Sequence, residues 1–85
     1  MAADHHRLVA NHGFTTYIDV AAALHFLNSI PNAVIAEYVA QGNTKLRDVV
    51  TRQKIAAKDG YLDIPEDPGL GVELDDEAIR KFRVA

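Results

Sequence analysis

The sequence predicts an α/β fold in which one helix connects two short parallel strands. Two apolar runs, residues 8–10 and 33–36, flank a segment whose apolar side chains recur with helical spacing. That segment is long enough for a parallel crossover, and continuous apolar runs are typical of parallel strands buried on both faces. We therefore expect buried strands over residues 7–10 and 33–36, with a helix between them.

The predicted helix begins after Thr16, whose hydroxyl can cap the first turn. Asp19 lies three positions later, in the arrangement of a loose capping box. Apolar residues then recur at i, i+3, i+7 and i+10, and three consecutive alanines add intrinsic helix propensity. The resulting face consists of Tyr17, Val20, Leu24 and Leu27. Pro31 and Asn32 end the helix before the second strand.

The rest of the chain, residues 39–85, is predicted to be a less regular tail. A loop is expected at residues 42–43, and the segment 55–64 favours a hairpin about Asp59-Gly60. Asp-Gly is typical of tight turns with positive φ. Pro65, Pro68, Gly69 and Gly71 then predict an irregular, turn-rich stretch.

Two short helices are predicted within this tail. Apolar residues near Leu46 allow one helical turn, and a last helix begins at Asp75 with acidic residues first and basic residues last. That charge order suits the helix dipole. Ile79 and Phe82 are expected to face a core.

Composition narrows the functional classes. The chain has 85 residues, a formal net charge of -3 and no cysteine. Clustered basic residues, which phosphate backbones require, are absent from the sequence, so nucleic acid is not an expected partner. No apolar run has membrane-spanning length, and without cysteine there are no disulfides or thiolate metal sites. A cytoplasmic location is the default expectation.

Two titratable side chains follow the two predicted strands. His12 comes after the first strand and Glu37 after the second. In parallel α/β sheets and barrels, functional sites form outside the carboxyl ends of the strands. A histidine there exchanges protons near neutral pH, and a carboxyl group facing it can donate a proton or hydrogen-bond to a developing oxyanion. This pattern points to a pair that moves a proton on or off a substrate carbon lying between the two groups.

Each feature also has a plain structural explanation. A histidine after a strand is often a loop residue, and a strand-end glutamate is often only solvated. His5 and His6 could end a helix as cations, or bind a metal, although no third ligand follows at a recognisable spacing. His25 is more simply explained by packing or exposure on the helix. Residues 69–71 form a turn and lack the context of a phosphate loop.

The sequence resembles the C-terminal end of the mandelate racemase and muconate lactonizing enzyme subgroup of the enolase superfamily. Two segments carry the resemblance, "VANHGFTTYIDVAAALHFLNSIPNAVIAEY" and "DGYLDIPEDPGLGVELDDEAIRKFRV". The combination of a strand-end His-Gly, "PNAVIAE" and "PGLGVEL" is specific, whereas no single piece is. The "NHGFTTY" variant is most similar to members that act on sugar acids, including dehydratases and a cycloisomerase.

This resemblance implies the end of a TIM-like (β/α)7β barrel. His12 matches the general base at the end of the seventh strand, which pairs with an aspartate from the sixth. Glu37 matches the acid, or electrophile, at the end of the eighth strand. The family binds Mg²⁺ through carboxylates on earlier strands, so no metal ligand is expected in this chain. The metal stabilises an enediolate formed when a proton leaves the carbon beside a carboxylate.

The resemblance therefore implies a C-terminal fragment of a Mg²⁺-dependent acid-sugar dehydratase, racemase or cycloisomerase. Residues 1–85 would be a partial barrel domain, with a strand–helix–strand unit over 1–38 and a tail with hairpin and terminal helix over 39–85. Such a chain is expected to be inactive alone and to need the rest of the barrel or a homo-oligomer. Apolar tail residues would then lack partners here, namely Leu62, Ile64, Leu70 and Val72. The alternative is a small non-catalytic interaction module derived from the barrel tail.

Overall fold

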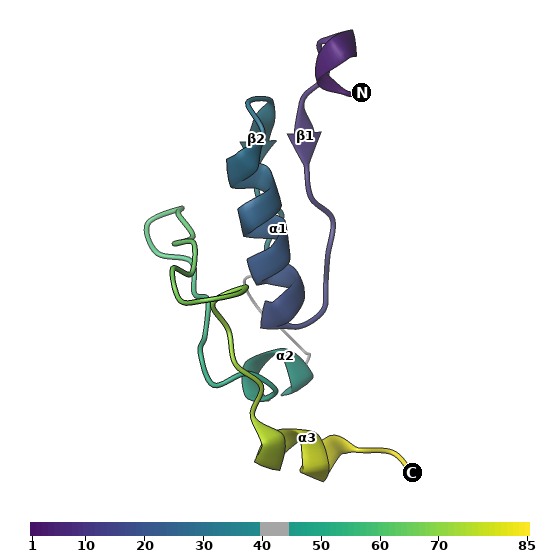
Figure 1. The fold of residues 1–85 in the computed structure, drawn as a ribbon, viewed down its shortest axis with the longest axis vertical. Coiled ribbons are helices and arrows are strands. Elements are labelled where there is room, and N and C mark those ends of the chain that lie inside the picture. The colour runs from purple at the N-terminus through teal and green to yellow at the C-terminus, as the bar shows by residue number, and fades with distance from the viewer. Residues whose placement is uncertain (40–44) are drawn as a thin grey trace.

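The computed structural model describes residues 1–39 and 45–85, so the loop predicted at residues 42–43 lies outside the described residues. The elements in chain order are the 3-10 turn η1 (Ala3–His5), β1 (Val9–Ala10), α1 (Tyr17–Ser29), β2 (Ala33–Ile35), α2 (Lys45–Val49) and α3 (Asp76–Phe82) (Figure 1). None of the described helices combines the length and apolar character that a membrane span requires.

The strand–helix–strand prediction is confirmed. β1 and β2 pair in parallel, with Val9 opposite Ala33 and Ala10 opposite Ile35, and the register is irregular between the two pairs. The amide of Val9 donates a hydrogen bond to the carbonyl of Asn32 at 2.9 Å, which extends the pairing by one residue. Helix α1 forms the crossover and runs alongside both strands (Figure 1).

Local signals set the beginning of α1. The Thr16 hydroxyl accepts a hydrogen bond from the Ile18 amide at 3.3 Å, as expected of an N-cap. The Asp19 carboxylate, which the capping box directs back toward the cap, lies instead over Gly13. A side chain at position 13 would collide with it. The glycine after His12 therefore leaves room for the first turn of the helix.

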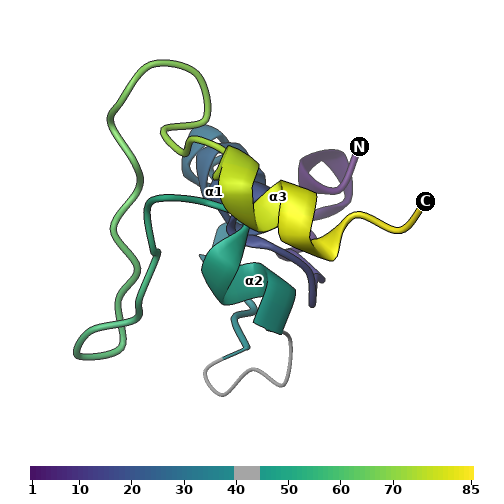
Figure 2. The ribbon, with the colours of Figure 1, turned by 90° about the horizontal axis from the view of Figure 1, so that it is seen from below.

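The core forms where α1 meets the tail. Tyr17, Ala21 and Leu24 on α1 are buried together with Ile55 from the tail. Partly buried residues pack around them, namely Val20, Ala36, Tyr38, Leu62, Ile64 and Val72. In Figures 1 and 2 the teal-to-green part of the tail between α2 and α3 lies on the side of α1 away from β1, and in Figure 1 α2 and α3 lie beyond the beginning of α1. The predicted apolar face of the helix is confirmed, because Leu27 is buried as well.

Two expectations about burial are wrong. The strands are not buried on both faces: Leu8 beside β1 is 69% exposed and Ile35 in β2 is 68% exposed. Within residues 1–39 and 45–85 the sheet has only these two strands, so no further strand pairs with their outer edges. The tail residues Leu62, Ile64 and Val72, expected to lack partners, pack against the core instead, because the tail folds back onto α1.

The tail contains the predicted hairpin turn. Lys58 and Tyr61 exchange two backbone hydrogen bonds of 2.8 and 2.9 Å, and Asp59 and Gly60 both have positive φ, as a type I′ turn requires. Only this closing bridge forms. The expected long hairpin is otherwise open, and Ile55 on one side of the turn and Leu62 and Ile64 on the other belong to or pack against the core.

The last helix begins where the sequence predicts, but it packs differently. The Asp75 carboxylate caps α3 by accepting hydrogen bonds from the amides of Glu77 and Ala78, both at 3.0 Å. The Asp75 amide donates to the carbonyl of Val50 at 2.8 Å, which ties the start of α3 to the end of α2. No residue of α3 is buried. The expectation that Ile79 and Phe82 face a core is wrong, because these residues are 36% and 39% exposed on a helix that lies at the surface.

Candidate functional site

The structure brings His12 and Glu37 into contact. His12 lies two residues after β1 and Glu37 two residues after β2, and the parallel pairing places both at the same end of the sheet. The His12 Nδ1 atom is 2.8 Å from the Glu37 Oε2 atom. The ring of Phe14 meets the His12 imidazole edge-on, with 5.0 Å between the ring centroids.

Asn11 continues the strand pairing as far as Glu37. Its side-chain oxygen accepts a hydrogen bond from the Glu37 amide at 2.7 Å, and its side-chain nitrogen donates to the Glu37 carbonyl at 3.1 Å. One side chain thus replaces the next rung of the ladder beyond the ends of β1 and β2. The backbone that carries the Glu37 carboxyl group is held against the residue before His12.

This geometry defines which nitrogen of His12 is available for proton transfer. An ionised carboxylate only accepts hydrogen bonds, so in the neutral form of His12 the bond to Glu37 places the proton on Nδ1 and the lone pair on Nε2. The His12 side chain is 77% exposed and that of Glu37 39% exposed, so the imidazole is the more accessible of the two groups. The direct contact differs from the expected arrangement of two groups facing each other across a substrate carbon.

The most buried charge of the region belongs to a residue that the sequence analysis missed. Arg47, on α2, is 6% exposed. Its guanidinium carbon lies 5.4 Å from the ring centroid of Tyr17 and 5.5 Å from that of Tyr38, within the range of cation–π contact. Arg47 also donates a hydrogen bond to the Val39 carbonyl through Nη1 and to Asp48 Oδ1 at 3.1 Å through Nε.

Protonation in this cluster follows from burial and pairing. Burial raises the pKa of the Tyr17 phenol to about 12, with a further contribution from neighbouring Tyr38. Burial disfavours the charge of Arg47, but its hydrogen bond to Asp48 and the nearby tyrosines outweigh that and raise its pKa. The hydrogen bond from Arg47 in turn lowers the pKa of Asp48. The cluster therefore carries one cation and one anion at neutral pH.

The other histidines considered as candidates lie outside the strand-end site. His5 ends η1, and His6 follows it with positive φ. His25 on α1 lies 3.3 Å from the Leu70 carbonyl through Nε2, so it fastens the turn over residues 69–71 to the helix. Among the residues that the structure describes, no three His, Asp or Glu side chains converge as metal ligands. The magnesium ion implied by the family resemblance thus finds no fitting site in this part of the chain.

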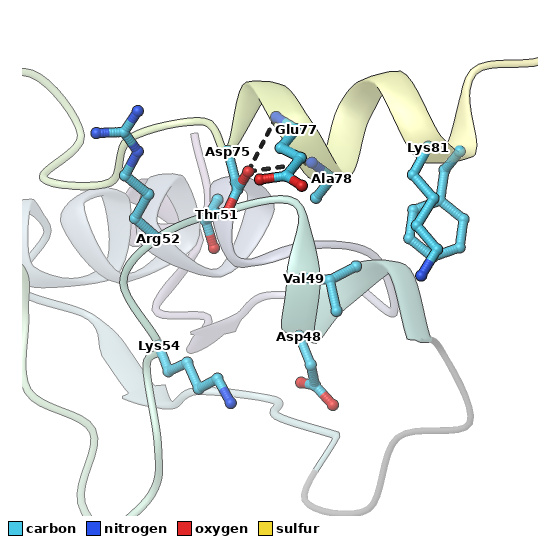
Figure 3. Close-up of a pocket in the computed structure, with 10 residues that line it drawn as sticks. Asp48, Val49, Thr51, Arg52, Lys54, Asp75, Glu77, Ala78 and Lys81 are labelled. Carbon is cyan, nitrogen blue, oxygen red and sulfur yellow. Dashed lines mark hydrogen bonds between the residues drawn. The ribbon is translucent and has the colours of Figure 1, made fainter.

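A separate hollow lies between α3 and the segment that follows α2 (Figure 3). Side chains of both signs line it, including Asp48, Lys54 and Lys81. Asp75 also lines it, but its carboxylate is engaged in capping α3. Since neither His12 nor Glu37 reaches this hollow, we place the candidate site at the strand ends.

Comparison with known proteins gives the family. The sequence profile of the family described as "Enolase C-terminal domain-like" matches residues 1–78. D-mannonate dehydratase Caul1427 of Caulobacter sp. is 40% identical over 74 residues, which are 85% of this chain and 18% of that protein. D-galactarolactone cycloisomerase of Agrobacterium fabrum is 31% identical over 84 residues, which are 89% of this chain and 22% of that protein.

A solved structure agrees with these sequence relationships. A crystal structure of a protein from Salmonella enterica serovar Typhimurium superimposes with a TM-score of 0.86 at 30% identity, covering 95% of this chain and 20% of that one. The chain thus spans about a fifth of the length of the relatives it matches. Because the family profile covers nearly all of its residues, the chain belongs to the enolase C-terminal domain-like family.

Proposed function

We propose that His12 and Glu37 form the proton-transfer pair of an acid-sugar dehydratase, racemase or cycloisomerase, as general base and general acid. The observation that carries this proposal is their contact at 2.8 Å at the carboxyl ends of neighbouring parallel strands. Relatives of this chain are named as dehydratases and cycloisomerases of sugar acids and lactones. In this proposal residues 1–85 supply the last strand–helix–strand unit of a (β/α)7β barrel and its tail.

The proposed step begins with the proton on the carbon beside the substrate carboxylate. That proton moves to His12 Nε2, and the electron pair of the C–H bond enters the enediolate. Loss of a β-hydroxyl group, assisted by a proton, completes a dehydration, whereas return of a proton to carbon completes an isomerisation. The imidazolium that forms keeps its Nδ1 proton in the hydrogen bond to a carboxylate, which stabilises the positive charge.

Glu37 has two parts in this proposal. In the chain as described it orients the His12 ring through Nδ1. In a complete barrel, an aspartate from the sixth strand would take Nδ1, as the family resemblance implies, and the Glu37 carboxyl group would turn to the substrate as proton donor. Magnesium would need carboxylates from outside the described residues, so no step here is routed through it.

The exposed strands indicate what a complete enzyme must add. Leu8 and Ile35 are more than half exposed beside β1 and on β2, and both outer edges of the two-stranded sheet are unpaired in the described part of the chain. Open edges and apolar faces of this kind favour association. We propose that the remaining strands of a barrel, or other copies of the chain, cover them, and that the chain alone does not turn over substrate. A cytoplasmic location is part of the same proposal.

A hybrid enzyme tests this function. Residues 1–85 would replace the matching C-terminal segment of D-mannonate dehydratase Caul1427, and turnover would be measured on a panel of sugar acids with Mg²⁺. His12→Asn should abolish turnover, because Asn cannot accept the proton. His25→Asn is the matched control and should retain turnover, since His25 contacts only the tail turn.

Turnover by the His12→Asn hybrid would refute the proposed base. A folded, Mg²⁺-binding hybrid without activity on any substrate would instead favour the non-catalytic interaction module. Far-UV circular dichroism, compared with the parent dehydratase, establishes that each hybrid is folded.

A further inference from the structure

Arg47 contacts one residue from each of the two segments that follow β1 and β2 and carry His12 and Glu37. Tyr17, whose ring it contacts, is the first residue of α1 and ends the loop that carries His12. Tyr38, whose ring it also contacts, directly follows Glu37. Burying a charged group is costly unless it is paired and hydrogen-bonded, so a guanidinium at 6% exposure must be held by these specific contacts.

The contacts of Arg47 fix the backbone that follows Glu37. Its Nη1 atom donates to the Val39 carbonyl while the guanidinium lies against the Tyr38 ring. On the other side, Asn11 holds the amide and carbonyl of Glu37 itself. Tyr38 is fastened at its far end as well, because its hydroxyl donates to the Ile55 carbonyl at 2.7 Å. The three residues from 37 to 39 are thus anchored in succession.

A second, small hollow is lined by Asn11, Glu37, Val39 and Arg47, so Glu37 and Arg47 border a common space. A proton-transfer group must be held within a fraction of an ångström of its working position, and such groups depend on supporting side chains. We propose that Arg47 is a positioning residue: by anchoring residues 38 and 39 it fixes the backbone that carries Glu37, and in the chain as described it thereby holds the Glu37 carboxyl group against His12. This inference rests on the proposed function for its catalytic meaning, but the contact itself needs no substrate.

A lysine at position 47 should fulfil only part of the positioning role of Arg47. The planar guanidinium can lie between two aromatic rings and donate to a carbonyl at the same time, whereas an ammonium group is a compact point charge without that fork. Arg47→Lys is therefore expected to keep the charge and part of the positioning. Arg47→Met keeps a side chain of similar reach and is expected to lose both the charge and the positioning.

The test is the tautomer of His12 in the full chain, read from long-range ¹H–¹⁵N correlations of the ring at about pH 8, where an ordinary imidazole is neutral. The wild-type chain should hold the proton on Nδ1. Glu37→Ala should give the tautomer mixture of a free imidazole and calibrates the signal. Arg47→Met should lose the Nδ1–H form, and Arg47→Lys should retain an intermediate fraction.

Lys45→Met on the same helix removes an equal charge from an exposed position and should leave the tautomer unchanged. An Nδ1–H form that persists in Arg47→Met would overturn the proposal, even if the melting temperature falls. If Arg47→Met does not fold, Arg47→Lys decides: with the α1 amide resonances intact, an unchanged tautomer refutes positioning. Absence of the Nδ1–H form from the wild-type chain also refutes it. A failure of the proposed function is detected in a different experiment, as turnover by the His12→Asn hybrid enzyme.

Discussion

Substitution of Gly71 should reveal how the tail is held against α1. Gly71 has a φ of +77°, and an added Cβ would lie 3.1 Å from the carbonyl carbon of Pro65 and 3.2 Å from its Cα, with the Pro65 Cβ closer still. Because two of these atoms belong to the backbone, an alanine there forces the tail to shift. The adjoining Val72 packs against the core, so such a shift loosens it.

Gly69 provides the matched control. It has a φ of +74°, and an added Cβ would meet nothing within 4 Å. Both Gly→Ala changes pay the left-handed backbone penalty, about 1 kcal/mol, and both gain a similar amount from the less flexible unfolded chain. Only Gly71→Ala adds the overpacking cost, about 1–3 kcal/mol. The difference between the two variants therefore isolates the contact with Pro65.

Urea denaturation followed by circular dichroism at 222 nm measures this difference. Gly71→Ala should be less stable than Gly69→Ala by about 1–3 kcal/mol, which in a domain of this size lowers the melting temperature by at least about 4 °C. Equal unfolding midpoints would mean that the tail does not approach itself closely at Pro65, and the packing described for residues 65–72 would be incorrect.

Three further predictions concern the site and its surroundings. Asn11→Ala should lower the free energy of unfolding by about 2 kcal/mol, because it removes two hydrogen bonds to Glu37, and should shift His12 toward the tautomer mixture of a free imidazole. Asn32→Ala is the control: it loses only a hydrogen bond to the Arg7 carbonyl and should leave the His12 tautomer unchanged. Alkaline titration at 295 nm should show a tyrosine with a pKa near 12 that disappears in Tyr17→Phe. Because folding raises this pKa, its stabilising effect is complete below pH 10 and is lost as the pH rises toward 12; a single transition near pH 10 for all tyrosines would contradict the burial of Tyr17. Folding lowers the pKa of Asp48, so the stabilising effect of the Asp48 carboxylate is present above the ordinary pKa of 3.8 and is lost as the pH falls below that value. The urea midpoint of Asp48→Asn should therefore fall less on acidification than that of the wild-type chain. Parallel declines of the two midpoints would count against the pairing of Asp48 with Arg47.

Features that depend on near neighbours in the sequence could be predicted. The α1 face, the Thr16 cap and the Asp59-Gly60 turn each follow from residues within a few positions of one another. The parallel pairing also followed, because a helix of this length between two apolar runs leaves few other topologies. The pairing then placed His12 and Glu37 at one end of the sheet without further information.

Features that depend on distant residues could not be predicted. Nothing near Arg47 in the sequence indicates that Tyr17, thirty positions earlier, contributes one wall of its pocket. The apolar tail residues could not be assigned to α1 for the same reason, and Ile79 and Phe82 look like a core face although α3 stays at the surface. Asn11 carried one overlooked signal: a side chain with both a donor and an acceptor, directly after a strand, can continue the ladder.

The central claim is that His12 removes a proton from the substrate carbon. Deuterium incorporation at the α-carbon of a sugar acid, measured in D₂O with the hybrid dehydratase, tests it most directly. We predict incorporation by the wild-type hybrid, none by His12→Asn, and continued exchange with reduced turnover by Glu37→Gln. Incorporation by His12→Asn at the wild-type rate would contradict the account.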